Sequence, residues 1–192
     1  MSSLARNAGP LALLGGAVWV IATVALMAIP SSFAWLGLIV AMVLMGGAAL
    51  GLQAQLGVRT GRIGRLAAVA TAAGSVAILA LVLIALATSG GDMTTPPPPV
   101  VITLSFAAFL LWVVGSIVFA LSLLRASAIP TIAGWLIVLG ASVGTVASFA
   151  SGQSPSPLFY VPLGLLGVGW MLVGFAARTT TTREVDVAGQ AS

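Results

Sequence analysis

The 192-residue chain contains no cysteine and no histidine. Disulfide bonds, thiolate chemistry, Cys or His metal sites and histidine-ligated haem are therefore excluded. Only three residues are acidic, and none lies within an apolar run; they are Asp92, Glu184 and Asp186. Because hydrolysis or group transfer needs a base, a nucleophile or a metal, we expect no enzyme activity, no catalytic residues, no metal and no cofactor.

Charge is also scarce. Charged residues make up 5% of the chain, against about 25% in soluble domains, while 60% of residues are hydrophobic and the mean hydropathy is +1.21. A water-soluble domain of this composition would expose one large apolar patch. We therefore expect lipid to surround most of the chain, which by its length forms a single domain.

The basic residues are seven arginines, and lysine is absent. The net charge of +4 and the pI of about 11.6 raise the question of nucleic-acid binding. The arginines form no stripe, however, and no aromatic residues interleave with them, so we expect no nucleic-acid partner. The pattern favours the positive-inside bias of a membrane protein, and the usage of Arg, Ala, Val and Gly is typical of a GC-rich bacterial genome.

Six apolar runs have the length of about 20 residues that a bilayer core requires. In lipid, uninterrupted runs of this length satisfy their backbone hydrogen bonds only as helices. The sequence therefore predicts an all-α bundle of six transmembrane helices over residues 11–177. A segment of residues 1–10 precedes the bundle, and a tail of residues 178–192, with little apolar content, is predicted to be disordered. The runs are Leu11–Ile29, Phe33–Leu52, Leu66–Ala87, Val100–Leu124, Thr131–Ala150 and Leu158–Ala177.

With six spans, every arginine falls on one side of the membrane. They are Arg6, Arg59, Arg62, Arg65, Arg125, Arg178 and Arg183. The positive-inside rule then places both termini in the cytoplasm, in a multi-pass protein of the bacterial inner membrane. A cleaved signal peptide is the alternative for the first run, but its apolar stretch of about 19 residues exceeds the usual 7–15. We therefore expect a retained first helix.

The stretch "GVRTGRIGRL", residues 57–66, combines glycine with arginine. It lacks the Lys and the spacing of a Walker loop, and predicted helices rather than a strand flank it, so a phosphate-binding loop is not expected. Gly57, Gly61 and Gly64 are predicted to reverse the chain at the membrane surface. The nearby arginines are topology anchors and candidate contacts for anionic lipid headgroups. These headgroup candidates are Arg59, Arg62, Arg65 and Arg125.

Small residues recur at four-residue spacing in three runs. Such faces let helix backbones approach closely, either within one chain or against a membrane protein partner or a second copy. Packing within the chain is the favoured interpretation. The candidate residues are Gly47, Gly51, Ala70, Gly74, Gly140, Gly144 and Ser148.

Three tryptophans, Trp19, Trp112 and Trp170, fall near the middle of their runs. They could line a cavity for an apolar ligand, a quinone or a pigment. They could equally be large packing residues opposite the many Gly and Ala residues, which is the more usual role of a buried indole.

The segments "LGVRTGRIGRLAAVATAAG", "LRASAIPTIAGWLIVLGA" and "LGLLGVGWMLVGFAAR" resemble a group of uncharacterised actinobacterial-type six-span membrane proteins. The resemblance implies the six-helix arrangement and no catalytic residues. The expected function is that of a scaffold or accessory subunit that binds lipid or a membrane protein partner. A small permease or channel for a neutral or apolar solute is the alternative, although its usual mark, helices broken at mid-membrane, is missing because the prolines fall near the ends of the runs.

Overall fold

The computed structural model describes the backbone of residues 3–28, 32–89, 97–150 and 157–190, with all of their side chains except those of residues 32–33, 148–150, 157–159 and 179–190. Every element in this part of the chain is a helix, which confirms the predicted all-α class. The helices are α1 (Ser3–Arg6), α2 (Ala8–Ala28), α3 (Ser32–Thr88), α4 (Pro99–Arg125), α5 (Thr131–Ala150) and α6 (Pro157–Gln190).

Within the described residues, four helical stretches are long and apolar enough to cross a membrane, and a fifth, Thr131–Ala147 of α5, is apolar but shorter. The four are Ala8–Ala28, Ala34–Thr88, Pro99–Arg125 and Tyr160–Arg178. Large apolar side chains also cover the outside of the bundle, among them Ile21, Val76, Val146 and Phe175. Since water would not stabilise such a surface, these features indicate a membrane protein.

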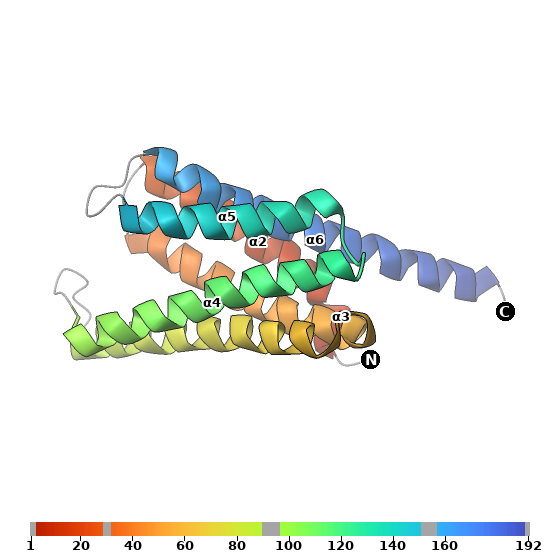
Figure 1. Cartoon of the computed structure of the whole chain (residues 1–192), viewed down its shortest axis with the longest axis horizontal. Helices are drawn as coiled ribbons and strands as arrows, with labels where there is room; N and C mark the ends of the chain where they lie inside the picture. The colour runs from red at the N-terminus through yellow and green to blue at the C-terminus, as the bar shows by residue number, and fades with distance from the viewer. Residues whose placement is uncertain (1–2, 29–31, 90–96, 151–156, 191–192) are drawn as a thin grey trace.

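Helix α3 is too long to be a single straight span. At about 1.5 Å per residue its 57 residues would extend about 85 Å, nearly three times the thickness of a bilayer core. The helix instead reverses at Gly61, whose φ of 65° and ψ of −163° are non-helical. Because the Ser75 hydroxyl donates a hydrogen bond of 2.8 Å to the Met42 carbonyl, residues 32–60 and 62–88 lie side by side as an antiparallel hairpin (Figure 1).

The reversal predicted between the runs that end at Leu52 and begin at Leu66 is thus wrong in its extent, because helix continues to Thr60 and resumes at Arg62. A helix supplies a partner for each backbone amide, so in lipid it persists until a residue can adopt the conformation needed to reverse. Of the three glycines in this stretch, only Gly61 has a positive φ. Gly57 is helical, and Gly64 serves close packing, since a Cβ there would lie 2.9 Å from Ser122 Oγ.

Replacing Gly61 by alanine is expected to lower the free energy of unfolding by about 1–3 kcal/mol, because this backbone conformation is essentially restricted to glycine. No atom lies within 4 Å of the position of an added Cβ, so the backbone alone is responsible. Gly57→Ala is the matched control and is expected to be neutral or stabilising by up to about 1 kcal/mol, since Ala replaces a helical Gly. Denaturant titration in mild detergent, followed by circular dichroism, measures both; equal stability of the two variants would contradict the assignment.

The connection between α4 and α5 is a compact helix end. The Ala128 amide donates to the Leu123 carbonyl and the Ser127 amide to the Leu124 carbonyl, both at 3.0 Å, which is a Schellman motif. Ser127 takes the left-handed position with φ of 49°, and Pro130 prevents the helix from continuing. The chain therefore turns back within five residues of Arg125.

The helical segments form a closed ring in which each lies next to its neighbour in the chain. Helix α2 packs on residues 32–60, this half of α3 packs on residues 62–88, and α4, α5 and α6 follow in order. Helix α6 then packs on α2 and closes the ring. The bundle is elongated, with its helices running along the long axis (Figure 1).

The backbone of α6 remains helical to Gln190, beyond the predicted end of the sixth span at residue 177. This part of the helix extends past the other helices (Figure 1). A helical segment anchored by packing can propagate because each added residue forms one more hydrogen bond. Helix rather than irregular chain therefore occupies residues 178–190, where the composition predicts disorder.

Candidate functional site

One end of the bundle carries arginine side chains from four separate places in the chain. This end holds the N-terminus, the reversal in α3, the turn between α4 and α5 and the outgoing part of α6 (Figure 1). The arginines whose side chains the structure describes are all exposed there; they are Arg6, Arg59, Arg62, Arg65, Arg125 and Arg178. We refer to this surface as the arginine end.

Short contacts beneath the arginine end bring its segments together. The Gln55 side-chain amide donates a hydrogen bond of 2.5 Å to the Ala5 carbonyl, which ties α3 to α1. An added Cβ at Gly9 would lie 3.1 Å from Arg178 Cγ, so α2 and α6 also meet at this level. The Thr60 hydroxyl donates to Gln53 Oε1 at 2.8 Å beside the reversal. A polar layer therefore lies directly below the arginines.

The charge of this end is of one sign among the side chains that the structure describes, because they include no carboxylate. Arg62 and Arg65 are three residues apart on one helix and so occupy the same side. Arg125 lies in the last turn of α4, where the helix dipole favours a cation. Guanidinium groups bind phosphate through paired hydrogen bonds, so the surface suits a phosphate-bearing lipid headgroup.

The predicted small-residue faces contact other helices of the same chain. An added Cβ would lie 2.5 Å from the Leu4 carbonyl oxygen at Gly51, 2.7 Å from the Trp112 amide at Gly74 and 2.5 Å from the Leu166 amide at Gly140. Gly144 faces Leu163, Ala70 lies beside Gly115, and Gly47 makes an ordinary contact of 3.7 Å with Leu11. The Ser148 side chain lies outside the described residues. Use of these faces by a second chain stays a prediction.

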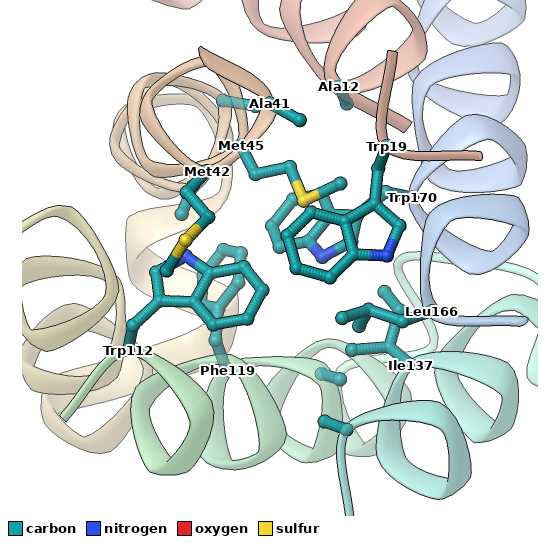
Figure 2. Close-up of a cluster of buried hydrophobic side chains, with 14 of the residues drawn as sticks. Ala12, Trp19, Ala41, Met42, Met45, Trp112, Phe119, Ile137, Leu166 and Trp170 are labelled. Carbon is teal, nitrogen blue, oxygen red and sulfur yellow. The ribbon is translucent and has the colours of Figure 1, made fainter. Parts of the chain in front are cut away.

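The middle of the ring is filled by aromatic side chains that pair across it. The Trp19 and Trp112 rings stack with centroids 5.3 Å apart, and the Phe119 and Trp170 rings with centroids 6.4 Å apart. The three indoles are only 1–2% exposed. Figure 2 shows these rings gathered with the Met45 thioether between the helices. The rings pack on one another, and a cavity lined by them stays a prediction.

The indole N–H groups of this cluster differ in their bonding. Trp19 Nε1 donates a 2.6 Å hydrogen bond to the Leu163 carbonyl of α6. The Nε1 atoms of Trp112 and Trp170, and the hydroxyl of Ser116, are buried without a hydrogen-bond partner. Sequence reasoning did not single out Ser116. The available signal was its position four residues after Trp112, which places both on one face of α4.

A shallow groove lies at the opposite end from the arginines, between residues 62–88 and α4. Its volume is about 440 Å³ and its lining consists of alanine, leucine and isoleucine side chains, among them Ala77, Leu81, Leu104 and Ala108. Such a surface suits hydrocarbon but offers no polar group for orienting a particular ligand.

Comparison with protein-family models, with curated proteins and with solved structures finds no match to this chain. The resemblance to actinobacterial-type six-span membrane proteins therefore stays a prediction.

Proposed function

We propose that the chain is a non-catalytic, multi-pass protein of the bacterial inner membrane that crosses the bilayer six times. Each half of α3 is long enough to span about 30 Å, as are α2, α4 and α6. Support for six spans comes from the hairpin in α3 and from the arrangement of α5 between α4 and α6. The arginine end faces the cytoplasm under the positive-inside rule.

Reporter tags inserted at Thr94 and at Thr181 are expected in opposite compartments, with the Thr181 tag in the cytoplasm. The reason is that an odd number of spans separates the two positions in the six-span arrangement. Protease protection or compartment-specific labelling of intact cells locates each tag. If both tags lie in one compartment, the six-span topology is wrong.

The proposed role is that of a scaffold or accessory subunit that binds anionic lipid, and through it or beside it a membrane protein partner. The observation that carries this role is the convergence of Arg59, Arg62, Arg65 and Arg125, all exposed, at one end of the bundle. Each arginine near a membrane surface contributes about 1 kcal/mol of attraction to anionic lipid. Four together would retain anionic headgroups in preference to zwitterionic ones.

Substituting these four arginines by glutamine is expected to reduce anionic-phospholipid retention at low salt by at least tenfold, since the loss of attraction is about 1 kcal/mol per residue before screening. Mass spectrometry of phospholipid retained by the purified protein from mixed anionic and zwitterionic nanodiscs measures the change. The same four positions changed to lysine are the control, because lysine keeps the charge. Unchanged retention in the glutamine variant would remove the basis of the proposal.

A permease or channel for a neutral solute is the second candidate. The observation that favours it is the set of unpartnered hydrogen-bonding groups on α4 and α6 inside the ring. The packed aromatic centre weighs against an open path, so the scaffold role has the stronger support.

A further inference from the structure

The centre of the bundle contains hydrogen-bonding capacity that the protein itself does not use. Six serine and threonine side chains are buried in the described part of the chain, and five of them donate hydrogen bonds. The exception is Ser116, which is 0% exposed and has no partner. Two buried indoles, Trp112 and Trp170, share this property.

The unpartnered hydroxyl of Ser116 is unusual, because a serine or threonine inside a helix ordinarily donates a hydrogen bond to a carbonyl of its own helix. Thr23 and Thr71 donate to the carbonyl four residues earlier at 2.8 and 2.9 Å, and Ser122 to the carbonyl three residues earlier at 2.7 Å. Ser116 could reach the Trp112 carbonyl in the same way. Its hydroxyl forms no such bond, so it is free to bond a group from outside the chain.

The three unpartnered groups lie on α4 and α6, two helices that the Phe119–Trp170 ring pair joins. Ser116 lies between Trp112 and Phe119 on the inward face of α4, and Phe119 stacks on Trp170 with centroids 6.4 Å apart. The seven residue steps from Trp112 to Phe119 rise about 10 Å along the helix. The Trp112 ring stacks on a different pair of rings, those of Trp19 and Phe109. Trp112 and Ser116 therefore lie within about two helical turns of the ring pair that includes Trp170.

The chemistry of these groups defines what they bind. An indole N–H can only donate, and a serine hydroxyl can donate as well as accept. The complementary group is therefore a hydrogen-bond acceptor. None of the described side chains within the ring is charged, and an unpaired ion there would be strongly disfavoured. The acceptor is thus neutral, as in water or the carbonyl oxygen of a lipid-soluble molecule.

We infer that the centre of the bundle binds small neutral molecules through acceptor oxygens, with Trp112 Nε1, Ser116 Oγ and Trp170 Nε1 as separate donors. Such molecules satisfy groups that would otherwise be unpartnered in a medium without bulk water. Met42 and Met45 lie beside the indoles (Figure 2), and their unbranched side chains can adjust around an occupant. This site is independent of the arginine end and of the lipid proposed there.

The first test is the sign of the stability change in Ser116→Ala. A bound acceptor loses a hydrogen bond in this variant, so the midpoint of thermal unfolding is expected to fall by about 2–6 °C. A hydroxyl without any partner would give the opposite result, because alanine removes an unsatisfied polar group. Ser122→Ala is the matched control on the same helix, where the loss is one bond within the helix. A midpoint that is unchanged or raised in Ser116→Ala overturns the proposal.

The second test identifies the acceptor in the full chain, purified into nanodiscs. Indole ¹⁵N resonances are assigned with Trp112→Phe and Trp170→Phe, and cross-peaks from the Nε1 protons to water indicate water as the occupant. Extraction followed by mass spectrometry, with loss of the same compound from Ser116→Ala, indicates a carbonyl-bearing molecule instead. Either result supports the site. Finding neither the water cross-peaks nor such a compound overturns it.

Discussion

Gly16→Ala is expected to lower the free energy of unfolding by about 3 kcal/mol, at the upper end of the range for overpacking a well-packed interior. A Cβ at this position would lie 2.5 Å from the Gly167 carbonyl oxygen and 2.7 Å from the Met171 amide nitrogen. Both are backbone atoms of α6 and cannot rotate away. Helices α2 and α6 would have to separate, and in lipid close packing is a main source of helix association.

The matched control is Gly164→Ala on α6, three residues from Gly167. No atom lies within 4 Å of an added Cβ there, so the change is expected to be neutral or stabilising by up to about 1 kcal/mol. Unfolding of both variants in dodecylmaltoside with added sodium dodecyl sulfate, followed by circular dichroism, gives the comparison. If Gly16→Ala is as stable as Gly164→Ala, α2 and α6 do not meet as described.

Trp19→Ala is expected to lower the free energy of unfolding by about 3–5 kcal/mol, the usual cost of truncating a large aromatic residue in a core. The side chain is 2% exposed, stacks on Trp112 at 5.3 Å and donates a hydrogen bond to the Leu163 carbonyl. The variant therefore loses the contact across the ring and the link to α6 together. Trp19→Phe keeps a ring and is expected to lose only about 1 kcal/mol, the worth of the hydrogen bond.

Trp35→Ala provides the comparison for a tryptophan on the outside of the bundle. Its side chain is 56% exposed, so lipid fills most of the space that the indole leaves. The free energy of unfolding is therefore expected to change by no more than about 0.5 kcal/mol. The same detergent titration, normalised to the unsubstituted protein, measures all three variants. Equal losses at Trp19 and Trp35 would show that the central aromatic cluster does not stabilise the bundle.

Much of the helical arrangement follows from length and polarity alone. The predicted runs begin and end within a few residues of α2, α4 and α5, because Pro, Gly and Arg mark where apolar sequence stops. The reversal in α3 was predicted in the right place but too long, since three glycines are equivalent in sequence and only Gly61 needs a positive φ. The helical continuation to Gln190 was not predicted, because a polar composition indicates only that a segment has little apolar surface to pack. A helix that is already anchored can propagate through such a segment.

The two candidate sites differ in how far the sequence reveals them. The arginine end could be predicted, because alternating direction of successive spans brings Arg59 and Arg125 to one side without any knowledge of packing. The unpartnered hydroxyl of Ser116 could not be predicted. These helices are apolar on all sides, so no amphipathic pattern indicates which face turns inward. Which of the mid-span hydroxyls lacks a partner depends on that rotation and on the neighbouring helices.

The ring order of the helices has a consequence for biogenesis. Every neighbouring pair except one is made of segments that leave the ribosome in succession, so each new segment can dock on the one before it. The exception is the pair of α2 and α6. The glycine-lined face of α2 that contacts α6 therefore stays uncovered until the last helix is synthesised. A chain truncated before residue 157 would leave that face open in the bilayer, where insertion chaperones and membrane proteases could recognise it.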